Sequence, residues 1–184
     1  MGAHDFSSSS ELRHSERYEN MAIAIHWVTV PLLLFVFMLG LTIDSFPKKS
    51  ASSVLNIHAI FGLSIFLISV IRVTSRRRVG KLSSATQITR LARFGHLALY
   101  FCLLGVPLIG IPALFFRGHA LDFGLFEVGP FFARNRGLAR ILTQTHLYAA
   151  YFLAILVVGH LLAVFLHAAI WKDGTLRKML PSRR

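Results

Sequence analysis

Six of the nine histidines lie inside long apolar stretches, where an ionisable side chain is costly. A neutral imidazole in such a place can bind a metal, relay a proton or hydrogen-bond to a neighbouring helix. One such histidine is most simply a hydrogen-bonding residue, but six in four stretches favour a shared function. The six are His26, His58, His96, His146, His160 and His167. His4, His14 and His119 lie in polar segments, and we assign them no role.

Four apolar stretches position these histidines, at residues 21–41, 54–73, 94–116 and 141–170. About 20 helical residues cross a hydrocarbon core of about 30 Å, and a backbone in lipid must bond to itself. The composition agrees, because 54% of the 184 residues are apolar and only 15% are charged. We therefore expect an all-α membrane protein. Its four-transmembrane-helix bundle covers residues 21–171, between a polar N-terminal tail (1–20) and a basic C-terminal tail (172–184).

Lysines and arginines set the orientation. Fourteen of them flank one side of the bundle, in the two tails and the second loop, and six flank the other. The positive-inside rule therefore predicts that both termini are cytoplasmic. The six outer residues are Lys48, Lys49, Arg117, Arg134, Arg136 and Arg140. This placement between apolar stretches also argues against a nucleic-acid partner for a chain of net charge +12.

The histidines fall at two depths. His58 lies about four residues inside the outer end of its stretch, and His146 about five residues inside the outer end of the fourth. His26 lies about five residues inside the cytoplasmic end of the first stretch. His160 follows His146 by fourteen residues, which puts it about 21 Å further along the helix and about 40° around it. One helix can thus supply a ligand to each of two stacked sites.

Haem b is the cofactor that fits two imidazoles at each depth. It takes only two axial protein ligands, whereas zinc takes four, usually with cysteine or carboxylate among them. No acidic residue lies in any apolar stretch, so none of the stretches contains Glu-x-x-His. Cys102 is the single cysteine, and C-x-x-C-H does not occur. We therefore expect two non-covalent b haems per chain. Gly62 and Gly159 would leave room beside the ligands, although such small residues also let helices approach.

The cytoplasmic site poses a choice between His160 and His167, seven residues apart on nearly the same face. Depth in the helix alone would favour His167 as the partner of His26. The interval between the two levels argues the other way. Eleven residues separate His26 from the level of His58 on the first helix, and the same interval from His146 ends close to His160. We therefore choose His160.

The chain resembles the bacterial cytochrome b561 family of four-helix dihaem membrane proteins over roughly residues 17–181. The motifs that carry this resemblance are, in order, Arg17-Tyr18, Ile25-His26-Trp27, Asn56-Ile57-His58 with Gly62, Gly95-His96-Leu97, Pro107-Leu108-Ile109-Gly110, Thr145-His146, Gly159-His160, His167, Trp171-Lys172-Asp173-Gly174-Thr175-Leu176 and Met179-Leu180-Pro181. The resemblance implies that His26 and His160 bind a cytoplasmic haem, and His58 and His146 a periplasmic one. It also implies a multi-pass protein of the bacterial inner membrane that exchanges electrons with the quinone pool.

Two axial imidazoles close both faces of an iron, so electron transfer is expected rather than oxidation of a substrate at the metal. The leading hypothesis is transfer between a periplasmic one-electron donor and quinone. Superoxide is a candidate donor, because Lys48, Lys49, Arg134 and Arg136 make the outer side basic. Two alternatives stay open: an anchor subunit of a dehydrogenase or hydrogenase, and a haem-free transporter whose histidines relay protons. The oligomeric state, a homodimer included, is also open.

Three residues at the cytoplasmic end are candidates for a quinone site: His167, Trp171 and Arg72. Arg72 follows His58 by fourteen residues and so lies on the same helix face at the opposite end. Each has a simpler interpretation, namely a propionate bond for His167, the aromatic belt for Trp171 and snorkelling to lipid phosphate for Arg72. We expect His96 to lie near the inner haem as a helix-bonding residue rather than a ligand.

Two further features lie toward the outer side of the predicted bundle. Pro107 and Pro112 predict a bend in the third helix, because proline lacks a backbone donor. The loop at residues 118–137 contains four phenylalanines and is expected to lie in the membrane interface. They are Phe123, Phe126, Phe131 and Phe132.

Overall fold

Four long helices make up the computed structural model, which describes residues 4–78 and 87–172, with side chains for 21–75 and 90–172. They are α1 (His4–Thr42), α2 (Lys48–Arg78), α3 (Gln87–Phe116) and α4 (Arg136–Phe165). A short 3-10 turn, η1 (Ile43–Ser45), follows α1, and a π-helical turn, η2 (Leu166–Trp171), extends α4. Each helix contains a segment long and apolar enough to cross a membrane. The prediction of a four-helix membrane bundle is confirmed.

The helical segments that are long and apolar enough to cross a membrane run over Met21–Ser45, Lys48–Ser75, Arg90–Phe116 and Arg136–Trp171. Each of them contains one of the four apolar stretches of the sequence. The outward-facing side chains are apolar, with Leu34 60%, Phe101 76% and Ile155 68% exposed. Such a surface would be unfavourable in water and suits contact with lipid. α3 continues through Pro107 and Pro112 without a break.

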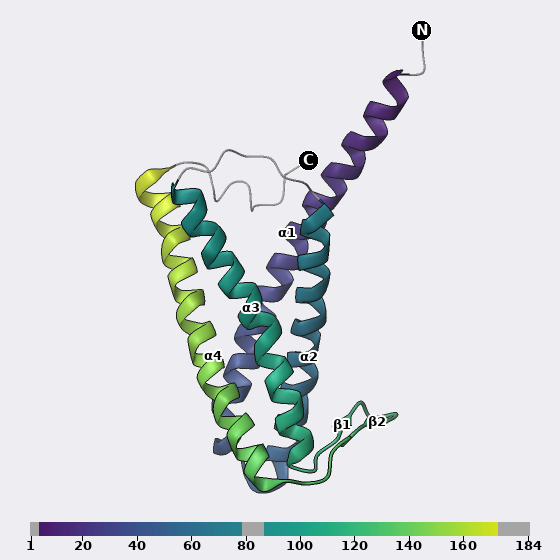
Figure 1. The fold of residues 1–184 in the computed structure, drawn as a ribbon, viewed down its shortest axis with the longest axis vertical. Coiled ribbons are helices and arrows are strands. Elements are labelled where there is room, and N and C mark those ends of the chain that lie inside the picture. Colours follow the sequence, from purple (N-terminus) through teal and green to yellow (C-terminus); the bar gives the residue numbers. More distant parts are fainter. Residues whose placement is uncertain (1–3, 79–86, 173–184) are drawn as a thin grey trace.

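The helices pair in chain order, α1 with α2 and α3 with α4, and α2 also packs on α3. They draw together at the end that carries the α1–α2 turn and diverge toward the other end (Figure 1). The core is a small apolar cluster from all four helices, in which Val36, Ile65, Val106 and Leu153 are among the buried residues. Cys102 is buried in this cluster as well. A second buried cluster, of Leu114, Phe115 and Leu121, lies where the end of α3 meets the following loop.

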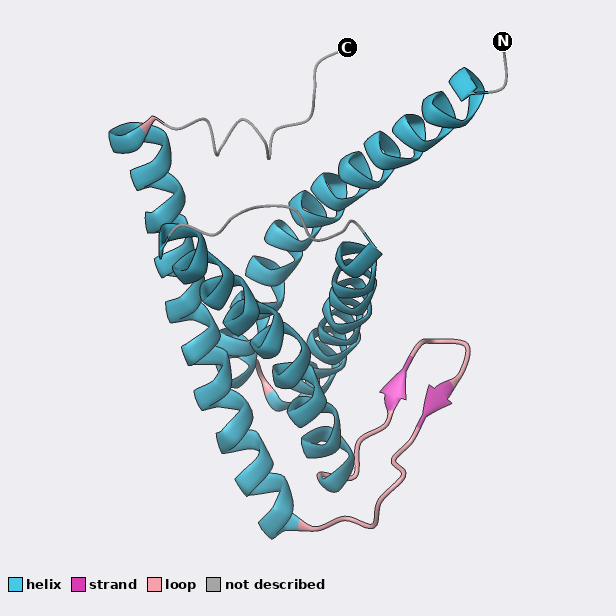
Figure 2. Ribbon diagram, turned by 45° about the horizontal axis from the view of Figure 1, so that its top comes forward, coloured by secondary structure: helices cyan, strands magenta, loops and turns pink. Residues whose placement is uncertain are grey.

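The loop between α3 and α4 forms a small hairpin, which the sequence did not predict. Strands β1 (Leu121–Asp122) and β2 (Glu127–Val128) pair antiparallel (Figure 2). The hairpin is tied to α2 by two bonds: the Asn56 amide donates to the Asp122 carbonyl (2.7 Å) and accepts from the Asp122 N–H (3.0 Å). Two-residue strands carry too little period-two pattern to be read from sequence.

The chain ends that the structure describes lie at one end of the bundle, as four spans require (Figure 1). α1 begins at His4, so backbone helix extends well before the predicted span at residue 21. The predicted basic C-terminal tail lies outside the described residues, except for Lys172. Which end faces the cytoplasm stays a prediction.

Candidate functional site

At the end near the α1–α2 turn, the rings of His58 from α2 and His146 from α4 lie next to each other in an edge-to-face arrangement. Their centroids are 6.0 Å apart and their planes are inclined by 82°. Nδ1 of His58 lies 2.9 Å from the carbonyl oxygen of Val36, and Nδ1 of His146 lies 2.9 Å from that of Val106. A carbonyl can only accept, so Nδ1 donates in both rings. Each neutral ring therefore presents an unprotonated Nε2, the form that binds a metal.

Two glycines make room for these rings. A Cβ atom at Gly110 would lie 2.8 Å from Cε1 and Nδ1 of His146, and one at Gly40 would lie 3.0 Å from Cε1 of His58. Any other residue would force the ring or the helix to move. The backbone of the neighbouring helix thus lies close to each imidazole. The carbonyl one helical turn before each glycine, that of Val36 or Val106, fixes the orientation of the ring.

A cavity of about 70 Å³ lies beside the two rings. Its walls come from all four helices and are apolar apart from the imidazoles; they include Leu33, Phe37, Ile65, Leu103 and Pro107. Gly62 also lines it, and nothing lies within 4 Å of where its Cβ would be. The same holds for Gly159 on α4. Gly62 thus leaves space beside the outer rings, whereas Gly159 is exposed and does not line this cavity.

Nearer the diverging end, four polar side chains from four helices meet. His26 from α1 and His160 from α4 have ring centroids 6.5 Å apart and planes inclined by 79°. The ring of His96 from α3 lies 5.5 Å from that of His160. Arg72 from α2 places a guanidinium nitrogen 2.8 Å from Nδ1 of His26 and lies over the ring of Tyr100 at 5.7 Å. We call His26 and His160 the inner pair, and His58 and His146 the outer pair. His96 lies beside the inner pair, at the depth expected from the sequence.

The ring separations can be tested against axial ligation of one iron. With a metal-to-nitrogen bond of about 2 Å and roughly 1.1 Å from nitrogen to ring centre on each side, two rings sharing one metal lie about 6.2 Å apart. The separations of 6.0 Å for His58 and His146 and 6.5 Å for His26 and His160 bracket that value. The 5.5 Å between His96 and His160 fits less well. Among the described residues, no group of three or more His, Cys, Asp or Glu could hold a metal ion by itself. The residues fit a haem rather than a protein-only metal centre.

The two pairs differ in how their rings are held. A guanidinium can only donate, so Nδ1 of His26 accepts from Arg72 and a neutral His26 carries its proton on Nε2. Iron binding at that Nε2 requires either loss of the proton or release of the ring by Arg72. The outer pair needs no such change.

The three quinone candidates separate into two places. His167 and Trp171 lie together in η2, with ring centroids 4.6 Å apart and planes inclined by 74°. Arg72 lies instead among the inner histidines, in contact with His26 and Tyr100. A π-helical turn widens the helix at this point, a distortion that is common at functional sites.

One spacing organises both levels. On every helix, an inner residue and an outer residue stand fourteen positions apart: His26 and Gly40, Arg72 and His58, His96 and Gly110, His160 and His146. The outer level therefore holds two histidines and two glycines, and the inner level holds three histidines and an arginine. The expectations from sequence rested on this interval only in α2 and α4. In the other two helices, the same interval leads from His26 to Gly40 and from His96 to Gly110.

Comparison with known proteins gives one family. The sequence model of the prokaryotic cytochrome b561 family matches residues 17–182. A protein of Yersinia pestis named probable superoxide oxidase CybB is 30% identical over 177 residues, which cover 92% of this chain and 98% of that protein. Cytochrome b561 homolog 1 of Escherichia coli K12 is 29% identical, over 91% of this chain and 99% of the relative. Cytochrome b561 homolog 2 of the same strain is 31% identical, over 90% and 92%.

Proposed function

The chain belongs to the prokaryotic cytochrome b561 family, and from that premise we propose that it carries electrons between a periplasmic one-electron donor and the quinone pool. It is an integral membrane protein of electron transfer, and the family uses b-type haem. The further steps of the proposal are two haems per chain, cytoplasmic termini in the bacterial inner membrane, and quinone as the acceptor.

The observation that carries the proposal is the pair of imidazole couples at 6.0 Å and 6.5 Å, stacked at two levels of one bundle. His58 and His146 would hold one b haem, and His26 and His160 the other. Bound haem would supply reversible one-electron chemistry at each level. The chain's own contribution is orientation: the carbonyls of Val36 and Val106 hold the outer rings with Nε2 free. The apolar cavity walls keep water from the outer pair.

Superoxide fits the donor side of this scheme. It gives up one electron and leaves as O₂, so two superoxide ions supply the two electrons that, with two protons, convert one quinone to quinol. Lys48, Lys49, Arg134 and Arg136 lie at the ends of the helices near the outer level and would attract an anion to it. The name of the Yersinia pestis relative, probable superoxide oxidase, supports this choice.

The acceptor side is proposed at η2. His167 can donate a hydrogen bond to a quinone carbonyl and pass on a proton, and the contact with Trp171 orients its ring. The described helices diverge at this end, which favours entry of a ligand from the membrane (Figure 1). Arg72 supports the inner histidines in this scheme rather than the quinone.

A reduced-minus-oxidised visible spectrum of the purified protein tests the first step, and superoxide pulses with a soluble ubiquinone analogue test the rest. We expect two low-spin b haems that superoxide reduces and quinone reoxidises, with O₂ and quinol as products. A protein without haem would favour the proton-relaying transporter. Haems that superoxide does not reduce, in a chain that co-purifies with a large metalloprotein, would favour the anchor subunit.

A further inference from the structure

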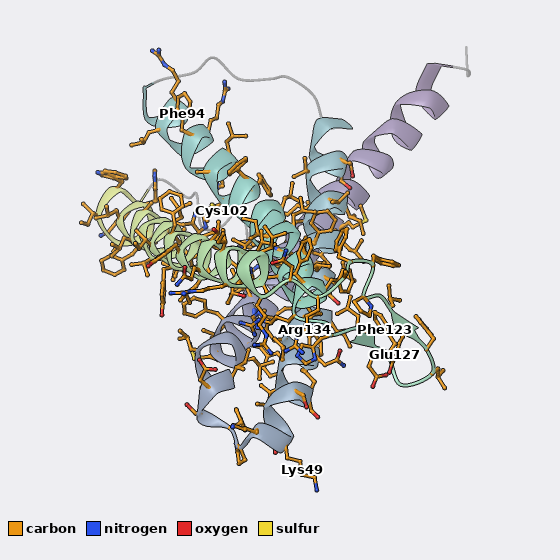
Figure 3. The ribbon with its side chains drawn as sticks, turned by 60° about the horizontal axis from the view of Figure 1, so that its bottom comes forward. Lys49, Phe94, Cys102, Phe123, Glu127 and Arg134 are labelled. Atoms are coloured by element: carbon orange, nitrogen blue, oxygen red, sulfur yellow. The ribbon has the colours of Figure 1, made fainter. Side chains whose placement is uncertain are left out.

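Four arginines and a histidine surround a hollow of about 390 Å³ where α3 ends and α4 begins. They are Arg117, His119, Arg134, Arg136 and Arg140. Four of the six basic residues on this side of the bundle thus converge on one place. Figure 3 shows Arg134 near the helix ends where nitrogen atoms gather, and Lys49 projecting away from it. The electron-transfer proposal does not use this hollow as a binding site.

The backbone around the hollow is fixed on both sides of the arginines. The N–H of Asn135 donates to the carbonyl of Phe116 at 3.0 Å, and the side chain of Asn135 caps α4 by accepting from the N–H of Leu138 at 3.0 Å. Phe116 and Phe132 stack with centroids 4.8 Å apart and planes inclined by only 14°. These contacts hold Arg134 and Arg136, on either side of Asn135, beside the end of α3.

The positive charge in the hollow has no counter-charge within the part of the chain whose side chains are described. The acidic residues of that part are Asp44, Asp122 and Glu127, and none of them lines the hollow. Arg136 is the first residue of α4 and Arg140 follows one turn later. The positive end of the helix dipole disfavours cations there, and like charges four residues apart repel. Both unfavourable effects would be relieved by an anion in the hollow.

The chemistry and the depth of the hollow indicate which anion. Guanidinium groups match the oxygens of phosphate in paired hydrogen bonds, and four of them can surround several oxygens at once. One membrane-spanning segment ends at Phe116 and another begins at Arg136, so the hollow lies at a boundary of the bilayer core. Lipid headgroups occupy that level. We propose that this hollow binds a phosphate group, carried by a phospholipid headgroup or by a soluble phosphate.

Two arms distinguish these sources in the haem-loaded protein purified in detergent. Native mass spectrometry compares retention of phosphatidylglycerol with that of monogalactosyl diacylglycerol, a lipid without phosphate. A separate titration follows the unfolding temperature with inorganic phosphate in place of lipid. Both arms use Arg136→Gln/Arg140→Gln, together with the matched control Lys48→Gln/Lys49→Gln, which removes the same charge from the same side outside the hollow.

We expect wild type and control to hold phosphate alike, and Arg136→Gln/Arg140→Gln to bind it at least about tenfold more weakly, since each charged hydrogen bond lost is worth about that factor. Without phosphate, Arg136→Gln/Arg140→Gln should unfold at or above the temperature at which the wild type unfolds, because it removes charges that repel one another. Selective phosphatidylglycerol retention assigns the site to lipid, and a response to inorganic phosphate assigns it to a soluble ligand.

Three results would overturn the proposal. They are equal phosphate binding by all three proteins, equal retention of the galactolipid by a wild type that also does not respond to inorganic phosphate, and loss of haem in step with loss of phosphate. The last would assign the arginines to a haem carboxylate. Should the double variant not fold, Arg140→Gln alone serves the same comparison.

Discussion

Replacing Gly110 by alanine tests the outer site through a single methyl group. The new Cβ would lie 2.8 Å from Cε1 and Nδ1 of His146. Non-bonded carbon atoms prefer separations of about 3.5–4.0 Å, so the ring must move by roughly 0.7–1.2 Å. That movement breaks the 2.9 Å bond between Nδ1 of His146 and the carbonyl of Val106, because the carbonyl belongs to the same helix as the new methyl group.

The expected cost follows from these two losses. Overpacking a tight contact costs roughly 1–3 kcal/mol, and a lost hydrogen bond adds about 0.5–1.5 kcal/mol. Together they amount to about 1.5–4.5 kcal/mol, which corresponds to a decrease in haem affinity at the outer site of about 10- to 2,000-fold. Gly40→Ala should have a smaller effect, since its Cβ would meet His58 at 3.0 Å rather than 2.8 Å.

The matched control is Gly105→Ala on the same helix, where nothing lies within 4 Å of the added Cβ. It should keep both haems and stabilise the fold by about 0.4–1 kcal/mol, because alanine leaves the unfolded chain fewer backbone conformations than glycine does. Haem per chain is measured by the pyridine haemochrome assay, and spin state by low-temperature electron paramagnetic resonance. Two fully occupied low-spin haems in Gly110→Ala would refute the assignment of His146 as an iron ligand in this position.

Three further outcomes are expected. Acid-acetone should extract two b haems per chain, and haem retained on the protein, or only one per chain, would contradict the two-level arrangement. His58→Ala and His146→Ala should each empty the same haem or make it high-spin, and His26→Ala and His160→Ala should do so for the other; spectra of the four variants show whether they sort in this way. His167→Ala should keep both haem spectra but slow haem reoxidation by quinone in stopped flow, and unchanged kinetics would remove His167 from the quinone site.

The helices could be predicted from sequence because lipid allows few alternatives. A run of about 20 apolar residues without an acidic residue has no water to satisfy its backbone, so it must be helical. The ends of the helices were predicted less well, since polar residues continue a helix beyond the bilayer without any apolar signal. α1 thus starts at His4, and α2 starts at Lys48 rather than near residue 54.

The candidate ligands could be found from spacing, while their immediate partners could not. Fourteen residues bring His146 and His160 to one face, and the structure places each beside the partner that we expected. Which carbonyl receives Nδ1 of each ring depends on how deeply neighbouring helices pack, and no sequence pattern encodes that depth. The position of Arg72 against His26 has the same origin, because it depends on how α2 rotates against α1.

The two levels differ in whether their histidines could bind iron without a rearrangement. At the outer level, carbonyl oxygens fix the rings with Nε2 free, and the backbone at Gly110 leaves no room for a Cβ beside His146. At the inner level, the contact of Arg72 with His26 must change before that ring can bind iron through Nε2. The helices draw together near the outer level and diverge beyond the inner one (Figure 1). A level that must adapt is best placed at the diverging end, where His167 and Trp171 also lie and where quinone would enter and leave. On the function proposed above, the more fixed outer level would serve a small diffusing donor, and the level that must adapt would serve a large membrane-borne acceptor.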